Sequence, residues 1–422
     1  MKSILKNIVT AILIWESKQI LKKYKPSIIA VTGTVGKTST KDAIYTVLSS
    51  REYVRKSDKS FNSEIGVPLT ILGCQNGWSD PLIWISNIFH GLELIYFKSD
   101  YPKCLVLEVG ADHPGDIQSI SKWLKTDISI ITKVGDVPVH VEFFKTPADV
   151  LREKSYLINA LKPEGLLILY ADDKKVSALA QGVKQTVYSF GITEMATVTA
   201  SDASVLYDDM KLPAGISFKL NYKGEVVTMK LYGILGVQQI YPILAAATVG
   251  VIRNVPLSAI VDSFEHHIFP KGRMNILAGI NRSVVIDDSY NSSPDALREA
   301  LNALASLQVA GKRIAVIGDM MELGNYSADE HRKAGIQAIQ SSDLLVTVGQ
   351  RSKIMANENS ISFDTSAEAA EYLKDIVAEG DVVLVKGSQS TRMERVTKAV
   401  MLESDNAAKY LVRQEAEWLA KK

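Results

Sequence analysis

The chain has 422 residues, and its 48 Lys and Arg against 47 Asp and Glu give it a formal net charge of +1. This length is too great for one ordinary core and indicates two or three domains. The balanced charge excludes the basic surface that nucleic-acid-binding proteins need, so we expect no nucleic acid among its partners. Two cysteines, Cys74 and Cys104, are too few for a disulfide framework, and this is typical of a cytoplasmic protein.

Two segments near the N-terminus are strongly apolar. Residues 1–24 carry many Ile and Leu with lysines at both ends, and residues 82–97 are apolar but interrupted by polar side chains. The first segment is too short in its apolar part to span a bilayer and lacks the small-residue site of a signal peptide. We expect two helices, and we favour docking of the first on the central α/β domain, against the second segment, with a partner chain as an alternative. A peripheral membrane contact through residues 1–24 stays open, because basic flanks and a broad apolar face suit a membrane surface.

A glycine loop follows the first short apolar run. Residues 31–40 read Val-Thr-Gly-Thr-Val-Gly-Lys-Thr-Ser-Thr, and a helical pattern runs from Lys37 to about Leu48. Strand, glycine loop and helix in this order predict a phosphate-binding loop, in which backbone N–H groups and the helix N-terminus hold an anion. Lys37 would reach the β- and γ-phosphates of ATP, and the Thr38 hydroxyl would ligate Mg²⁺. The nucleotide-binding residues expected here are Gly33, Thr34, Val35, Gly36, Lys37, Thr38 and Ser39.

Alternating patterns along the chain predict an α/β fold. Short β-branched runs alternate with amphipathic stretches up to about Ala200, which indicates a mostly parallel sheet with helices on both faces. Period-two runs between Thr197 and Tyr232 predict a small antiparallel element attached to that sheet. A new α/β cycle then indicates a Rossmann-like C-terminal domain. The expected parts are an N-terminal helical segment, a central P-loop ATPase domain and this C-terminal domain, with the bounds 1–25, 26–271 and 272–422.

The same patterns predict individual elements. Strands are expected at 28–32, 104–109, 128–134, 166–170, 216–222, 226–231, 283–286, 313–317, 344–348 and 382–385. Helices are expected at 37–48, 115–124, 148–161, 239–251, 294–307, 327–339 and 367–377.

Further polar side chains follow the predicted strands of the central domain. Glu108 ends a buried run, where an acidic residue commonly positions Mg²⁺ in P-loop enzymes and where burial without a cation would be costly. His140 lies on a loop after another strand, at the edge where α/β sheets bind ligands. Asn62 and Ser63 precede a helix. Lys154 lies in an amphipathic helix and by itself is typical of an ordinary surface lysine.

Several spaced blocks resemble the Mur ligases, a family that has folylpolyglutamate synthetases as relatives. These blocks are the phosphate loop, Gly272–Met274 (GRM), Val285–Asp295 (VIDDSYNSSPD), Ala315–Gly324 (AVIGDMMELG) with His331, and Val385–Ser390 (VKGSQS). The resemblance runs from about Ser27 to Val400. It is strongest to those members that add D-alanyl-D-alanine to a UDP-muramoyl tripeptide in peptidoglycan synthesis.

The resemblance implies an ATP-dependent amide ligase. ATP would phosphorylate the tripeptide carboxylate, and the amine of D-alanyl-D-alanine would attack the acyl phosphate. Lys37, Glu108, His140 and Lys154 would be catalytic. Two Mg²⁺ ions would be held by Thr38, Glu108, His140 and Lys154. The resemblance further implies that Lys154 is carbamylated, because a CO₂ adduct supplies the negative charge that an ammonium beside two metal ions lacks.

The resemblance also implies which residues meet the nucleotide and the substrates. Arg273 would contact the nucleotide phosphates and Asp288 the ribose, both from the seam between the domains, while Gln239 could offer an amide to the nucleotide. The side chains expected at the acyl and amine substrates are Asn62, Ser63, Asn291, Asp319, Glu322, Lys386 and Ser388.

Two departures from the family pattern leave alternatives open. The segment Gly236–Pro242 lacks the histidine and asparagines of the usual motif, and about 25 residues before the first strand leave no room for the domain that grips the UDP-sugar. One alternative is a related carboxylate–amine ligase that acts on another acid. The other is a catalytically silent nucleotide-binding scaffold. For the leading hypothesis we expect a monomer whose partners are ATP and its small-molecule substrates.

Overall fold

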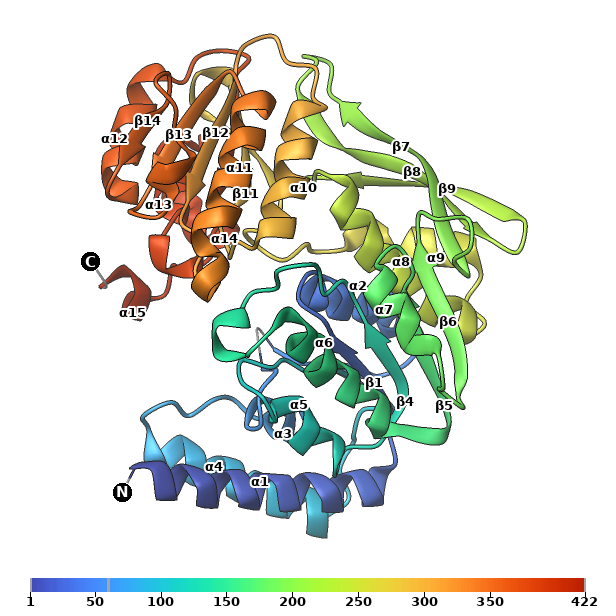
Figure 1. Cartoon of the computed structure of the whole chain (residues 1–422). Coiled ribbons are helices and arrows are strands. Elements are labelled where there is room, and N and C mark those ends of the chain that lie inside the picture. Colours follow the sequence, from blue (N-terminus) through green and yellow to red (C-terminus); the bar gives the residue numbers. More distant parts are fainter. Residues whose placement is uncertain (1, 59–60, 421–422) are drawn as a thin grey trace.

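The computed structural model describes residues 2–58 and 61–420. Within them the chain forms two sheets, each with its own helices (Figure 1). The first sheet has nine strands in the order β2-β3-β1-β4-β5-β6-β7-β8-β9, and the second has six in the order β10-β11-β15-β12-β13-β14. This arrangement confirms the predicted α/β fold with two successive sheets.

The first sheet is parallel from β2 to β7 and antiparallel across β7, β8 and β9. The small antiparallel element is therefore an extension of the main sheet. The strands are β1 (Ser27–Thr32), β2 (Val54–Lys56), β3 (Cys104–Glu108), β4 (Thr126–Ile131), β5 (Leu161–Tyr170), β6 (Thr186–Gly191), β7 (Val198–Tyr207), β8 (Pro213–Tyr222) and β9 (Glu225–Tyr232). The helices of this part are α1 (Lys2–Tyr24), α2 (Lys37–Ser49), α3 (Gly66–Leu72), α4 (Pro81–Tyr96), α5 (Asp116–Ser121), α6 (Pro147–Ser155), α7 (Lys174–Ser177), α8 (Ile240–Ile252) and α9 (Leu257–Ser263).

The second sheet is parallel except for its edge strand β10, which runs antiparallel to β11. Its strands are β10 (Asn275–Ala278), β11 (Val284–Asp288), β12 (Arg313–Gly318), β13 (Leu344–Val348), β14 (Ile361–Phe363) and β15 (Val382–Lys386). Its helices are α10 (Pro294–Ala305), α11 (Ser327–Ser341), α12 (Ser366–Ile376), α13 (Glu394–Val400), α14 (Ala407–Tyr410) and α15 (Ala416–Leu419). The division of the chain at residue 272 lies just before β10 and stays our proposal.

Strand β1 shows how the core of the first part is built. Side chains alternate across a strand, so β1 contributes to both faces of the sheet. Ile29 and Val31 belong to the core cluster that contains the buried side chains of α2 and α8. Ile28 and Ala30 belong to the cluster that contains buried residues of α1, α3 and α4. Helices therefore cover both faces, as the continuous apolar strands predict.

The register of the central strands brings three loops to one edge of the sheet. Val31 near the end of β1 lies opposite Glu108 at the end of β3, and it lies opposite Ile130 in β4. The phosphate loop, the loop after Glu108 and the loop that carries His140 therefore all start from the carboxyl edge of this sheet. Ligands of open α/β sheets bind at this edge.

Helices α1 and α4 pack together at the edge of the molecule, as the sequence predicts (Figure 1). The ammonium of Lys23 donates to the carbonyl oxygens of Leu94, at 2.8 Å, and Ile95, at 3.1 Å. The hydroxyl of Tyr24 also donates to the carbonyl of Leu94, at 3.0 Å. The C-terminal end of α1 thus satisfies carbonyls that the last turn of α4 leaves without helical partners. None of the described helices is long and apolar enough to cross a membrane.

Candidate functional site

The phosphate loop is a tight turn between β1 and α2. Gly36 has a φ of 86°, in the left-handed region that favours glycine. At Gly33, a Cβ atom would meet Oγ1 of Thr132 at 2.0 Å, so the close approach of the backbone requires glycine. The N–H groups of Thr34 and Val35 donate to the carbonyl of Lys133 at 2.8 and 3.1 Å. The loop is thereby held against the neighbouring strand, with the N-terminus of α2 facing the space above the sheet, which favours an anion.

A cavity of about 430 Å³ lies over this loop, between the two parts of the chain. We call the part that forms the first sheet the first half, and the part that forms the second sheet the second half. Strands β1, β3, β11 and β15 all end at it, so both sheets turn carboxyl ends toward the same space. The first half contributes Thr34, Val35, Gly36, Lys37, Thr38, Ser39, Asn62, Glu108, Asp112, Val139, His140, Gln238, Gln239 and Pro242. The second half contributes Arg273, Met274, Asp288, Tyr290, Asn291, Ser292, Ser293, Ala296, Glu299, Glu322, Lys386 and Gln389.

Glu108 is the buried carboxylate of this cavity, with 1% of its surface exposed. The Thr38 hydroxyl donates to its Oε2 at 2.9 Å, and the Asn62 amide donates to its Oε1 at 3.3 Å. The ammonium of Lys41 lies 3.9 Å from Oε2. Hydroxyl and carboxylate oxygens are the donors that Mg²⁺ prefers, and it usually takes only one or two from the protein. The pair of Thr38 and Glu108 therefore has the right chemistry for such an ion next to a nucleotide phosphate.

Two lysines lie deep in this region. Burial lowers the pKa of Lys37, while the Glu108 carboxylate partly restores it. Lys154 on α6 is 2% exposed, so it is not the surface lysine that its helix suggested. Burial, and then the charge of Lys37, lower the pKa of Lys154 to about 7. In the part of the chain that the structure describes, Lys154 is not among the residues that line the cavity.

His140 joins the two halves of the chain. Its Nδ1 lies 2.6 Å from Oε2 of Glu322, which belongs to the second half, and its Nε2 lies 3.5 Å from Oδ1 of Asp112. The hydrogen bond from His140 lowers the pKa of Glu322. Among the described residues, no three His, Cys, Asp or Glu side chains converge as a metal site. A metal ion here would therefore depend on oxygens of the nucleotide.

The second half presents a buried ion pair and a cation. The ammonium of Lys386 lies 2.6 Å from Oδ2 of Asp288 and donates to the carbonyl of Asn291 at 3.0 Å. Burial raises the pKa of Asp288, and Lys386 opposes this shift. The Arg273 guanidinium lies 4.1 Å from the centre of the Tyr290 ring. Arg273 thus faces the phosphate loop across the cavity, with its planar group stacked on an aromatic side chain.

Four expected site residues are engaged elsewhere. Oδ1 of Asp319 accepts from the N–H of Ser352 at 2.7 Å, and Oγ of Ser388 accepts from the N–H of Met321 at 2.8 Å. Oγ of Ser63 accepts from the N–H of Gly66 at 3.3 Å, and Gly33 is packed against Thr132. Within the described ranges, none of the four lines the cavity. Their direct contact with a ligand stays a prediction, whereas their role in shaping the loops is visible.

The cavity also contains side chains that the sequence did not single out. Asp112 lies four residues after Glu108, on the loop that follows β3, and its position at a strand end could have indicated it. Tyr290 belongs to the block VIDDSYNSSPD but was not selected. Gln238 lines the cavity beside the expected Gln239, which is 9% exposed. Only the packing of β3, α8 and the second half brings these residues together.

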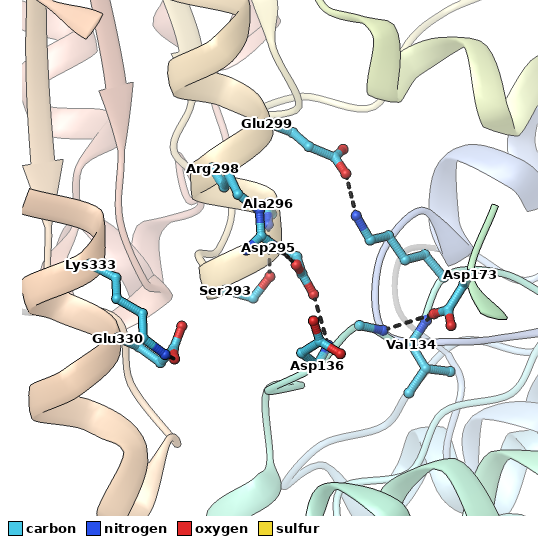
Figure 2. A network of polar contacts seen from close by, with 12 residues as sticks. Val134, Asp136, Asp173, Ser293, Asp295, Ala296, Arg298, Glu299, Glu330 and Lys333 are labelled. Atoms are coloured by element: carbon cyan, nitrogen blue, oxygen red, sulfur yellow. Dashed lines mark hydrogen bonds and ion pairs between the residues drawn. The ribbon is translucent and has the colours of Figure 1, made fainter. Parts of the chain in front are cut away.

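A network of polar contacts ties the second half to the loop after β4 (Figure 2). The N–H of Asp136 donates to Oδ2 of Asp295 at 3.2 Å, and Lys133 pairs with Glu299 on α10. On the other side, Oδ2 of Asp173 accepts from the N–H of Val134 at 3.2 Å. The carbonyl oxygen of Lys133 also accepts the hydrogen bonds from the N–H groups of Thr34 and Val35 in the phosphate loop. This network therefore connects the loop to α10.

A second cavity, of about 470 Å³, lies beside the pair of His140 and Glu322. Glu142, whose N–H donates to the carbonyl of Glu322 at 3.3 Å, and Arg351 are its charged walls. His331 is buried in the wall, where Nε2 accepts from the N–H of Met320 at 3.0 Å. The remaining wall residues are Gly324, Asn325, Ser327, Ala328, Gln350 and Ile354.

Comparison with known proteins matches two family models to this chain. Residues 31–84 and 88–250 match the family model described as the Mur ligase middle domain. Residues 272–389 match the one described as Mur ligase, glutamate ligase domain. Together the matches contain the phosphate loop, Glu108, His140, Lys154 and the residues around Asp288.

Individual relatives agree with these matches. A UDP-N-acetylmuramoyl-tripeptide–D-alanyl-D-alanine ligase of Bacillus subtilis is 26% identical, over 90% of this chain and 77% of the relative. One of Buchnera aphidicola is 28% identical, over 91% and 79%. The crystal structure of the MurF ligase of Thermotoga maritima with ADP has a TM-score of 0.77 at 25% identity, and covers 95% of this chain and 84% of that one. A MurF structure from Acinetobacter baumannii has a TM-score of 0.75, also at 25% identity, over 92% and 79%.

Proposed function

This chain belongs to the Mur ligase family and is an ATP-dependent ligase of peptidoglycan-precursor synthesis, and we propose that it joins D-alanyl-D-alanine to a UDP-muramoyl tripeptide. The names of the relatives in Bacillus subtilis and Buchnera aphidicola support this choice of substrates. The observation that carries the proposal is the cavity itself, in which the phosphate loop and Glu108 of one half face Arg273 of the other.

The reaction proceeds in two steps. A carboxylate oxygen of the tripeptide attacks the γ-phosphorus of ATP, the bond to the β-γ bridging oxygen breaks, and an acyl phosphate and ADP result. The dipeptide amine then attacks the acyl carbon, and phosphate leaves from the tetrahedral intermediate as the nitrogen loses its proton. Lys37 and Arg273 lie where they would hold the phosphate oxygens from opposite sides of the cavity. Such fixed cations stabilise the charge that develops on the transferring group.

We assign one Mg²⁺ to Thr38 and Glu108 and a second to the side of His140 and Asp112. Both pairs line the cavity, and Glu108 is a buried carboxylate beside a hydroxyl. Mg²⁺ at these places supplies positive charge to the phosphate oxygens. Glu108 would hold its ion near Thr38, and the hydrogen bond from Asn62 keeps the carboxylate oriented.

We also propose that Lys154 is carbamylated. Burial and the neighbouring Lys37 lower its pKa to about 7, so a large fraction of its amine is neutral at physiological pH. A neutral amine attacks CO₂, a nitrogen–carbon bond forms, and one proton is released. The product carries a negative charge beside Lys37, which removes the repulsion between two buried cations.

The second cavity is our proposed site for the dipeptide. D-Alanyl-D-alanine is a zwitterion, and this cavity has Arg351 for its carboxylate and Glu142 for its ammonium. Charge-assisted hydrogen bonds of this kind fix orientation as well as position. Glu142 is bonded through its backbone to Glu322, the partner of His140, so the ammonium end would lie toward the acyl phosphate.

We propose a cytoplasmic monomer. Two free cysteines, Cys74 and Cys104, fit a reducing compartment. A membrane contact through residues 1–24 alone has little support, because α1 buries Leu13 and Ile20 against its own protein.

The decisive experiment measures phosphate release with a panel of acyl and amine substrates. We expect release with UDP-muramoyl tripeptide to depend on D-alanyl-D-alanine, and the product to gain the mass of the dipeptide. The comparison amines are L-glutamate and ammonia, and other carboxylic acids in the acyl panel test the alternative ligase that acts on another acid. Phosphate release with L-glutamate or ammonia, but not with the dipeptide, would exclude our assignment. Binding of ATP without phosphate release in any combination of substrates would favour the silent scaffold.

A further inference from the structure

Helix α4 exposes a continuous apolar stripe. Leu82, Ile85, Phe89 and Tyr96 are exposed by 72, 50, 67 and 73%, and Leu92 between the last two is half-buried. Their spacing of three and four residues places them on one side of a helix. The opposite side of α4 is buried, through residues such as Gly91 and Leu94. A stripe of this composition on the solvent side is unusual for a surface helix, whose outer positions are normally polar.

The exposed apolar surface extends beyond this stripe. Phe97 directly follows α4 and is 67% exposed, and Trp78 in the preceding loop is 76% exposed. On α1, Ile8 and Trp15 are exposed by 51 and 45% and lie two turns apart on one side of that helix. Figure 1 shows α1 and α4 side by side at the edge of the molecule, far from the second sheet. We call the exposed apolar side chains of these two adjacent helices and their flanking loops, taken together, the α1–α4 face; they are Ile8, Trp15, Trp78, Leu82, Ile85, Phe89, Tyr96 and Phe97.

The exposed charges of α1 are all positive, whereas α4 has the exposed carboxylates of Asp80 at its N-cap and of Glu93. Lys18, Lys22 and Lys25 are exposed, and no ion pair involves them within the ranges that the structure describes. Glu16 is the only acidic residue in the sequence of α1, and it is fully buried. On α4 the only acidic residue is Glu93. The face therefore combines an apolar surface with unpaired lysines and few carboxylates.

We propose that the α1–α4 face binds the surface of a membrane that contains anionic phospholipids. Aromatic and aliphatic side chains on one face, with lysines beside them, match what interfacial helices present to lipid. Tryptophan and tyrosine also favour the boundary between headgroups and acyl chains. A second copy of the chain fits less well, because the exposed lysines of α1 would meet equal charges with few carboxylates to pair with. The cavity lies at the carboxyl edge of the first sheet, whereas α1 and α4 cover one of its faces, so the cavity stays open when the α1–α4 face is covered.

Vesicle sedimentation of the full chain tests the proposal. We expect binding to equimolar phosphatidylcholine and phosphatidylglycerol vesicles, much weaker binding to pure phosphatidylcholine, and a loss of binding at high salt. Phe89→Ser should weaken the apparent affinity by about tenfold, the size expected for losing one buried aromatic side chain. Lys18→Gln with Lys22→Gln should weaken binding to the anionic vesicles alone. Ile336→Ser is the matched control, since Ile336 is 62% exposed on α11, away from the face.

Phosphate release in solution reports the folding of each variant and should be unchanged. The proposal is overturned if the chain fails to sediment with anionic vesicles, or if Ile85→Ser and Ile336→Ser bind equally. It is also overturned if the chain forms a dimer in sedimentation velocity that Phe89→Ser abolishes, because the face would then bind a second copy.

Discussion

At the scale of single residues, the cavity contains two kinds of group. Charged side chains would act on the phosphates, and polar side chains keep these charges in place. Glu108 accepts hydrogen bonds from Thr38 and Asn62 and is almost completely buried, so its charge has a fixed direction. Lys37 lines the same cavity from the first turn of α2. Fixed charges in a dry site stabilise a transition state more than mobile groups in water do.

Lys37→Ala and Glu108→Ala should therefore each lower kcat by about 10²-fold or more, the usual effect of removing one preorganised electrostatic group. Steady-state phosphate release with saturating substrates measures this. Lys211→Ala, a change at an exposed turn, serves as the control and should keep its parent's rate. A rate within a few-fold of the parent in either cavity variant would contradict the assignment.

Lys154 gives a second prediction at this scale. Lys154→Ala should be nearly inactive, and short carboxylates such as acetate should restore part of the activity by occupying the vacated anion position. Lys154→Arg keeps a cation and cannot react with CO₂, so it should stay inactive. Carbon-13 bicarbonate should give a carbamate signal in the parent alone. A lysine without the adduct in a crystal that holds Mg²⁺ and nucleotide would refute carbamylation.

At the scale of elements, the packing of α1 on α4 encloses a carboxyl group without a partner. Glu16 is fully buried, neither of its oxygens has a hydrogen-bond partner among the described atoms, and a Cβ at Gly91 would lie 2.3 Å from Oε2. Burial raises the pKa of Glu16 from 4.5 to about 7. The folded protein therefore holds this proton more tightly than the unfolded chain does.

This contact predicts how stability depends on pH. The stability that the protonated Glu16 carboxyl group contributes is fully present below pH 4.5. It is lost as pH rises toward 7, because the unfolded chain releases the proton first. Glu16→Gln removes the ionisation and should recover roughly 3 kcal/mol of unfolding free energy near pH 7 relative to the parent. Thermal melts across this pH range measure the difference, with the exposed Glu265→Gln as the control. Equal pH dependence in the parent and Glu16→Gln would show that Glu16 titrates normally.

At the scale of the whole molecule, the site is complete only where the two halves meet. His140 and Glu322 pair across the seam, and Lys133 pairs with Glu299 on α10 beside the bond between Asp136 and Asp295 (Figure 2). The link between the halves runs through residues 271–275, which include Arg273 of the cavity. Substrate-induced closure of such an interface completes a site and excludes water.

We expect small-angle scattering to show compaction when an ATP analogue and the acyl substrate are both bound. Lys133→Ala should reduce this compaction and lower kcat/KM several-fold, because it removes a contact of the closed arrangement. Lys333→Ala breaks the pair with Glu330 inside α11, which does not cross the seam, and is the control (Figure 2). A scattering profile that does not change under saturating ligands would argue against closure. Equal compaction and equal kcat/KM in Lys133→Ala and Lys333→Ala would argue against the role of Lys133.

The sequence by itself determined the features that depend on neighbouring residues. The order of strand, glycine loop and helix placed the phosphate loop, and β-branched runs located the central strands, since burial on both faces demands continuous apolar residues. Helix ends were less certain. The expected helix 148–161 ends at Ser155, and residues 156–160 form a 3₁₀ turn before β5 begins at Leu161. The short strands β2 and β14, of three residues each, lie at sheet edges and were not foreseen, because three residues carry no clear period.

Only the tertiary structure decided which distant residues meet. Lys154 was typical of a surface lysine in its own helix, yet packing buries it beside Lys37 and changes its pKa. Asp319 and Ser388 belong to blocks that indicated the function, but their side chains are used to hold loops. The first apolar segment was expected to dock against the second, and the fold does pack α1 on α4 but leaves an apolar side of α4 in solvent. Burial and charge pairing depend on contacts between segments far apart in the chain, and no local pattern encodes those contacts.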